Sequence, residues 1–142
     1  MLTRSLLFGL IASPATAWEF APTGICTLSD ASEQAETLIT YDARLPEYAI
    51  AITLANGTWP EEPVFAIRFL PSGLTITTNR HVLSEGGRTL TVTDRGFGNV
   101  LDGLEFNALA VAILGDLQVT IPLEGAAPEV ELFRACPDPG SV

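Results

Sequence analysis

The stretch that decides the fold runs from Pro63 to Asp94 and reads PVFAIRFL (63–70), PSG (71–73), LTITTNRHVLSEGG (74–87) and RTLTVTD (88–94). Phe65, Ile67 and Phe69 recur at every second position, and threonines separate the apolar residues that follow. This period of two is typical of half-buried antiparallel strands. Because the Pro-Ser-Gly and Glu-Gly-Gly segments favour turns, the stretch predicts a β-meander with an apolar inner face and a threonine-rich outer face.

The segments on either side extend the β pattern. Residues 48–54 and 117–121 also alternate, residues 35–41 suit a strand, and residues 18–20 suit an edge strand or a tucked arm. Together with the meander, these segments predict a mainly β fold, an antiparallel β-sandwich.

Two helices are expected to complete the sandwich. Asn107 suits an N-cap position and Gly115 the position just after a helix, so we predict a short helix near 108–114. A strand over 110–114 is the alternative. Pro128 fits the first turn of a C-terminal helix near 128–136, which would present Cys136 to the body of the domain.

Residues 1–17 have the pattern of a signal peptide. Arg4 supplies the charge, residues 6–12 are apolar, and Ala15-Thr16-Ala17 is a small-x-small cleavage motif, so we expect cleavage before Trp18. A buried N-terminal helix is the alternative. No apolar run reaches the roughly 18 residues of a membrane span. We therefore expect a periplasmic or secreted protein whose residues 18–142 form a single β-rich domain.

The charge of the expected mature chain excludes some partners. After Ala17 the chain has six arginines, no lysine and 17 acidic residues, hence a net charge of −11. Such an acidic protein repels phosphate backbones and anionic membrane surfaces, so nucleic acid is not an expected partner.

The two cysteines, Cys26 and Cys136, are predicted to form a disulfide. An even count in an exported protein favours a bond, which here would close almost the whole domain. A redox-active or nucleophilic thiol is the alternative. The chain has no Cys-x-x-Cys motif, and neither cysteine neighbours a basic cluster that would lower its pKa.

Several kinds of chemistry lack the residues they need. His81 is the only histidine, so a Ser-His-Asp triad would have to use it, and the chain has no Gly-x-Ser-x-Gly elbow. A hydrogen-bonded structural histidine is the preferred interpretation. A chain without lysine has no nucleotide-binding P-loop. We expect no catalytic residue and no cofactor.

A glycine-rich loop is predicted over residues 94–105 and is the first candidate binding site. Its candidate residues combine oxygen ligands with one guanidinium: Asp94, Arg95, Asn99, Asp102 and Glu105. Calcium on Asp94, Asn99 and Asp102 is one hypothesis, and a plain structural turn is the preferred one. Trp59, in a proline-bounded loop, is expected to be partly exposed. Core packing is its preferred role, and it is also a candidate contact residue.

The order of elements resembles small exported alphaproteobacterial proteins of the invasion-associated locus B family. The resemblance rests on Trp18 and Cys26 after the signal, a β-rich middle, a short helix, a strand at 117–122, Leu-Glu-Gly-Ala at 123–126, and the final segment 130–136. It implies a periplasmic β-sandwich without established catalysis.

These features favour a non-enzymatic binding or interaction module that recognises a protein or small molecule in the periplasm. A small carboxylate- or metal-dependent hydrolase is the alternative. A deep pocket with converging carboxylates would favour the hydrolase, and a threonine face beside an exposed strand edge would favour the binding module.

Overall fold

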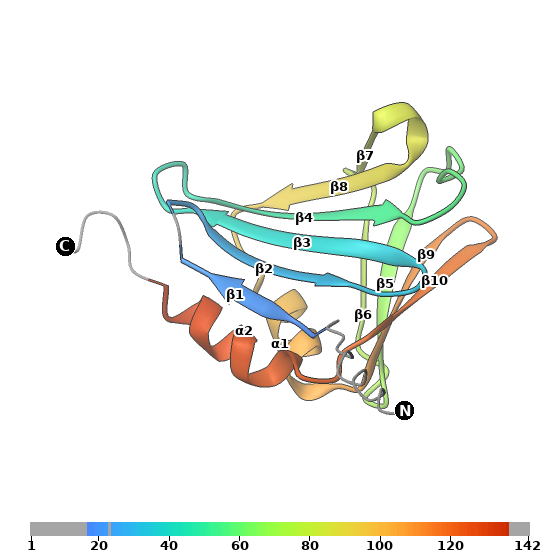
Figure 1. Cartoon of the computed structure of the whole chain (residues 1–142). Coiled ribbons are helices and arrows are strands. Elements are labelled where there is room, and N and C mark those ends of the chain that lie inside the picture. The colour runs from blue at the N-terminus through green and yellow to red at the C-terminus, as the bar shows by residue number, and fades with distance from the viewer. Residues whose placement is uncertain (1–16, 23, 137–142) are drawn as a thin grey trace, which may run out of the picture.

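Two antiparallel sheets form the framework of the computed structural model, which describes residues 17–22 and 24–136. Sheet A contains, in spatial order, β1 (Glu19–Ala21), β2 (Cys26–Ala31), β3 (Ala35–Asp42), β4 (Glu47–Leu54), β8 (Thr89–Asp94) and β7 (Val82–Ser84). Sheet B contains β10 (Leu117–Pro122), β9 (Leu109–Leu114), β5 (Phe65–Leu70) and β6 (Thr75–Thr78). The strands of the two sheets cross each other, and the helices lie at the β1 side (Figure 1). The predicted mainly β, sandwich-like fold is confirmed.

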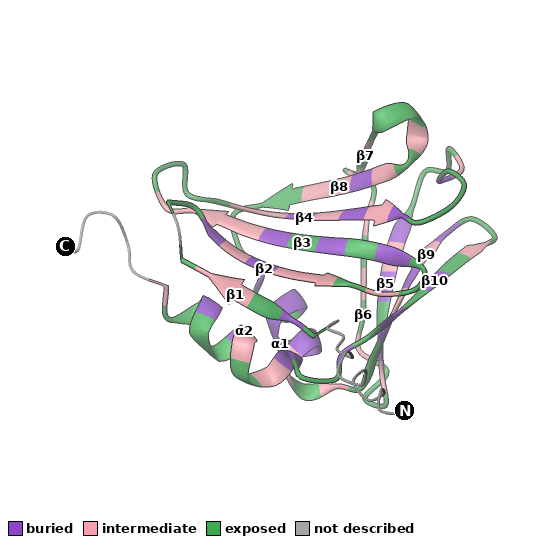
Figure 2. Ribbon diagram, viewed as in Figure 1, coloured by how far each residue is buried: buried purple, intermediate pink, exposed green. Residues whose placement is uncertain are grey.

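The core lies between the sheets because alternate residues of each strand face inward. In sheet A, Leu28 pairs with Ile39 and Ile39 with Ile50, so three neighbouring strands bury one continuous row. In sheet B, Ile67 pairs with the buried Ala112 of β9. Figure 2 shows buried and exposed residues alternating along β3. Period-two alternation thus gave the inward faces correctly.

The predicted meander is wrong in its pairing. β5 and β6 form a hairpin in sheet B, whereas β7 and β8 form a hairpin in sheet A. Residues 79–81 carry the chain from one sheet to the other. Alternation indicates that a strand has one buried face. Because both inner faces of a sandwich bury the same kind of residue, alternation does not indicate which strands pair.

The predicted short helix exists, but at other residues. Helix α1 spans Gly98–Phe106, and the segment predicted as helix, 108–114, contains β9 instead. β9 pairs on one side with β5 and on the other with β10, so two sets of ladder hydrogen bonds stabilise it as a strand. Asn107 follows α1 instead of starting a helix, and its Nδ2 donates to the carbonyl of Gly103 (3.1 Å). The alternative, a strand over 110–114, is correct.

Helix α1 packs tightly against sheet B. A Cβ added at Gly103 would overlap the ring of Phe69, which is fully buried on β5. Only glycine allows this close approach of helix and strand. The buried side chains of Val100, Leu101 and Leu104 share the inward face of the helix.

The C-terminal helix, α2 (Ala126–Arg134), is confirmed with a start two residues before Pro128. It buries Val130 and Phe133, and the Oε1 of Glu129 accepts a hydrogen bond from the Phe20 backbone N–H of β1 (2.9 Å). A side chain of α2 thereby satisfies an edge-strand donor that would otherwise be open to another strand.

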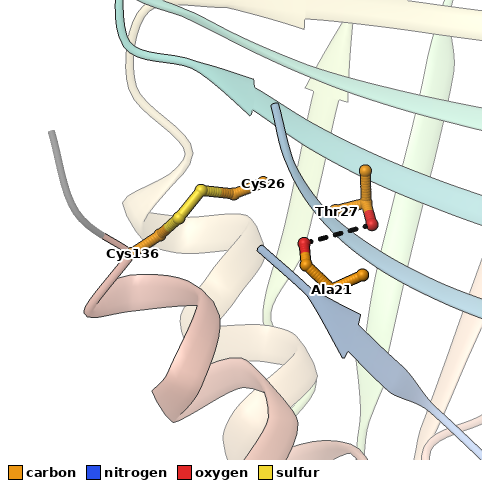
Figure 3. The surroundings of a disulfide bond; sticks show 4 residues. All are labelled: Ala21, Cys26, Thr27 and Cys136. Carbon is orange, nitrogen blue, oxygen red and sulfur yellow. Dashed lines mark hydrogen bonds between the residues drawn. A yellow bond between two sulfur atoms is a disulfide. The ribbon is translucent and has the colours of Figure 1, made fainter. Parts of the chain in front are cut away.

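The predicted disulfide between Cys26 and Cys136 is confirmed. The Cα atoms are 6.5 Å apart, and 110 residues separate the cysteines in sequence. Figure 3 shows the bond joining the start of β2 to the residues just after α2. The bond therefore ties both ends of the described chain together.

The expected signal peptide falls on residues 1–16, outside the described residues, and on Ala17, which is described. Among the helices of residues 17–22 and 24–136, none has the length and hydropathy needed to cross a membrane.

Candidate functional site

A groove opens where two strand edges are left without partners. β6 is the last strand of sheet B, so its outer side pairs with nothing in the described chain. β7 pairs only with residues 89–91 of β8, which leaves residues 92–94 unpaired on that side. The hollow between these edges has a volume of about 460 Å³. This is within the size range of small-molecule sites, roughly 300–1,000 Å³.

The walls of the groove are two apolar cross-strand pairs. Ile50 and Val92 form a pair on sheet A, and Ile67 and Ile76 form a pair on sheet B. Ile50 and Ile67 belong to the buried core, whereas Val92 and Ile76 are partly exposed. The sheets thus meet along a continuous apolar surface that is covered at its bottom and open at its mouth.

The segment 96–99 also lines the groove, and the packing of Phe97 holds this segment in place. The Phe97 ring is 4% exposed and stacks on Tyr48 with ring centroids 5.3 Å apart. The centroids of the Tyr48 and Tyr41 rings are 4.4 Å apart. Burial raises the pKa of the Tyr48 hydroxyl, Tyr41 raises it further, and Arg134 lowers it. Tyr48 therefore stays neutral at physiological pH and acts by packing.

The polar groups of the groove lie at its rim. Arg80 and Asp94 are both exposed and line the opening: Arg80 lies in the segment after β6, and Asp94 is the last residue of β8. The Asp94 carboxylate accepts a hydrogen bond from the Arg95 backbone N–H (2.6 Å). Within residues 17–22 and 24–136 the Arg80 guanidinium makes no ion pair, and its backbone N–H donates to the Thr78 hydroxyl (3.1 Å). Arg80 is therefore available to an anionic group.

Two other hollows lie beside Ala17 and have a different character. They measure about 780 and 520 Å³, and both are lined by Ala17 and Asp30. Their remaining lining is rich in small, acidic and hydroxyl-bearing residues, with few large apolar side chains. An apolar hollow with a few polar groups is the usual form of a small-molecule site, so the groove between β6 and β8 is the stronger candidate.

The candidate binding segment 94–105 is divided by the structure. Asp94 and Asn99 line the groove, but Asp102 and Glu105 lie on α1 and accept hydrogen bonds from Arg134 of α2 at 2.6 and 3.0 Å. The prediction of one continuous loop is wrong because α1 begins at Gly98. The apolar spacing of 100, 101 and 104 gives that helix a buried face, which outweighs its glycines.

A calcium site at Asp94, Asn99 and Asp102 finds no support in this arrangement. The Asp102 carboxylate pairs with Arg134. Among the described residues, no three histidine, cysteine or carboxylate side chains are grouped closely enough to hold a metal ion.

Two further residues singled out in the sequence have structural roles. Trp59 is 3% exposed and its Nε1 donates to the Ile52 carbonyl (3.1 Å), so the preferred role in core packing is confirmed and the expected partial exposure is wrong. A proline-bounded loop can still fold back onto the core, as this one does. The Nε2 of His81 is 2.9 Å from the Glu62 carbonyl, which fits the preferred structural interpretation.

Sequence reasoning missed Arg80 and the wall residues Ile76 and Val92. These residues were visible as parts of strands, but the groove exists only because β6 and β8 belong to different sheets. The chain passing between the sheets at residues 79–81 was the available signal, since Asn-Arg-His interrupts the alternation there.

Comparison of the chain with protein families, with curated proteins and with solved structures finds no match. The resemblance to the invasion-associated locus B family therefore stays a prediction.

Proposed function

We propose that the chain is an exported, non-enzymatic binding module whose groove between β6 and β8 holds a small amphipathic ligand. The observation that carries this proposal is the apolar hollow of about 460 Å³ walled by two cross-strand pairs from different sheets. An apolar ligand portion would exclude water from the partly exposed side chains of Ile76 and Val92. Burial of apolar surface supplies roughly 25 cal/mol per Å², so this contact would provide most of the affinity.

The rim gives the ligand an orientation. Arg80 offers a planar fork of donors that suits a carboxylate, sulfonate or phosphate. In a chain with a net charge of −10, an unpaired arginine at the mouth of an apolar groove is a local exception. We expect the anionic end of the ligand at Arg80 and its apolar portion between the walls.

A carboxylate-dependent hydrolase has less support. Asp94 is the only carboxylate among the described residues that line the groove. Glycoside hydrolysis by paired carboxylates needs two such groups about 5–10 Å apart. The single carboxylate at the rim favours recognition over acid–base chemistry.

Export is the second part of the proposal. The Cys26–Cys136 disulfide supports it, because disulfides persist in oxidising compartments such as the periplasm. The intact mass of protein recovered from the periplasm is expected to correspond to a chain that starts at Trp18. Uncleaved protein in the cytoplasm would contradict this part of the proposal.

The groove is tested with 8-anilinonaphthalene-1-sulfonate, a fluorescent probe with an apolar body and one anionic group. Ile76→Trp fills the groove from its wall and is expected to weaken binding at least tenfold. Thr75→Trp is the matched control, since Thr75 is exposed on the same strand and does not line the groove. Equal probe affinity in the two variants, both folded by circular dichroism, would refute the site.

A further inference from the structure

The start of the expected mature chain lies at a fixed place in the fold. In the β1–β2 ladder, Glu19 pairs with Ser29 and Phe20 with Leu28. Extending this register by one residue puts Trp18 opposite Asp30. Residues opposite each other in an antiparallel pair have Cα atoms about 4.5–5.5 Å apart.

Trp18 is anchored by its side chain, so its backbone position is well defined. The indole is 3% exposed and its Nε1 donates to the Pro122 carbonyl (3.0 Å). By strand alternation the Asp30 side chain points to the same face of sheet A as the Trp18 side chain. Ala17 and Asp30 both line the two hollows at this corner, which places the Ala17–Trp18 bond near Asp30.

Within the described chain, no basic residue lines the two hollows beside Asp30. The other ionisable residues that line the two hollows, within the described chain, are Glu19, Glu33, Glu36 and Glu124. Burial raises the pKa of the Asp30 carboxyl. The hydroxyl of Thr37, the cross-strand neighbour of Asp30, is buried without a hydrogen-bond partner. Among the described residues, this corner therefore combines a carboxylate without a counter-ion and an unsatisfied hydroxyl.

We propose that cleavage between Ala17 and Trp18 creates an α-ammonium group that forms an ion pair with Asp30 and thereby stabilises the mature fold. This inference rests on the proposed export. A signal peptidase would supply the reaction: water adds across the Ala17–Trp18 peptide bond, Ala17 leaves as a carboxylate, and the Trp18 nitrogen is retained and protonated. The new cation appears next to Asp30, at a residue that the core already holds in place.

If the ion pair forms, the effect of Asp30→Asn on stability depends on whether the chain has been cleaved before Trp18. In the uncleaved chain the raised pKa of Asp30 means that its contribution to stability is present at acid pH and lost as the pH rises through that pKa. Asp30→Asn is then neutral or stabilising at pH 7. In the mature chain the ammonium lowers the pKa of Asp30, so the contribution is present at pH 7 and lost as the pH falls through it. Asp30→Asn is then destabilising.

The absence of lysine provides a direct test. A purified chain that starts at Trp18 has one amino group, so acylation acetylates only its N-terminus. The acetyl group removes the charge and replaces the Ala17 carbonyl. At pH 7 we expect acetylation to lower the folding equilibrium constant at least tenfold in the unsubstituted chain and less than twofold in Asp30→Asn. Glu33→Gln, which removes a neighbouring carboxylate, is the matched control and is expected to keep the full effect.

A second readout follows the amine itself. The pH dependence of its acylation rate is expected to give a pKa at least one unit above the usual value of about 7.7–8.0, and Asp30→Asn is expected to remove most of that increase. Equal acetylation effects with and without Asp30, or an unshifted amine, would overturn the ion pair. These proteins are prepared with Trp18 first, so their result is independent of the mass measurement that tests export.

Discussion

Removing the disulfide is the perturbation whose magnitude follows most directly from the structure. Cys26 and Cys136 are 110 residues apart in sequence, so the bond closes a loop that contains nearly all of the described chain. In the chain-entropy model a loop of about 100 residues restricts the unfolded state by about 4.7 kcal/mol. Because whole domains are stable by about 5–15 kcal/mol, we expect the loss of this bond to remove a third or more of the stability.

The double variant Cys26→Ala/Cys136→Ala tests this figure. Alanine is preferable to serine because Cys26 is 5% exposed and a hydroxyl there would be buried without an assured partner. Urea unfolding of the variant and of the oxidised parent chain, analysed with a common slope, gives the difference in unfolding free energy. Chemically reduced parent protein serves as the control, since it keeps both side chains and lacks only the bond.

Hydrogen exchange distinguishes the proposed cause from a local one. If the bond acts on the unfolded state, the slowest amides of β3 and β4 lose as much protection as those of α2. A loss below about 1 kcal/mol, or a loss confined to α2, would refute the entropic account and leave the disulfide as a local clip.

Four substitutions test the packing and the roles of Trp59 and His81. Gly103→Ala is expected to cost more than about 2 kcal/mol in urea unfolding because its new methyl group overlaps a core ring, whereas Gly98→Ala in the same helix meets no atom within 4 Å and is expected to be neutral or slightly stabilising. Trp59→Phe should cost about 1–3 kcal/mol through its lost buried hydrogen bond and leave probe binding unchanged; weaker binding would restore Trp59 as a contact residue. His81→Ala should likewise leave probe affinity within twofold, and a tenfold loss would show a direct role for the ring.

The sequence predicted the strands well because each bears a simple, local signature. Residues 48–54 alternate and residues 35–41 have the composition of a strand, and the structure has both segments in neighbouring strands of sheet A. The disulfide was also predictable, because an exported chain with two cysteines has one possible pairing. These inferences needed no knowledge of how distant segments meet.

The errors arose where tertiary contacts outweigh local preference. Leu109–Leu114 has residues that suit either helix or strand, and pairing with both β5 and β10 decides for the strand. The glycines of 96–103 suggested a loop, yet Gly103 is glycine because Phe69 lies against it. The composition of these segments alone shows neither the pairing of β9 nor the contact between Gly103 and Phe69.

The candidate site could be predicted only in part for the same reason. Asp94 and Asn99 were identified, and both line the groove. Arg80 and the wall residues were not, because their proximity depends on the chain passing from sheet B to sheet A between β6 and β7. Asp102 and Glu105 were grouped with Asp94 and Asn99 because they are close in sequence, but in the structure both carboxylates pair with Arg134.

The central claim, a ligand groove between β6 and β8, is tested most directly by methyl NMR. Protein labelled at isoleucine and valine methyl groups is titrated with 8-anilinonaphthalene-1-sulfonate, with Arg80→Gln as a second sample. We expect the Ile76, Ile67 and Val92 methyl signals to shift together along one binding curve, and Arg80→Gln to weaken that curve several-fold. Shifts confined to exposed apolar residues elsewhere, such as Ile25 or Val64, with the groove signals unmoved, would contradict the account.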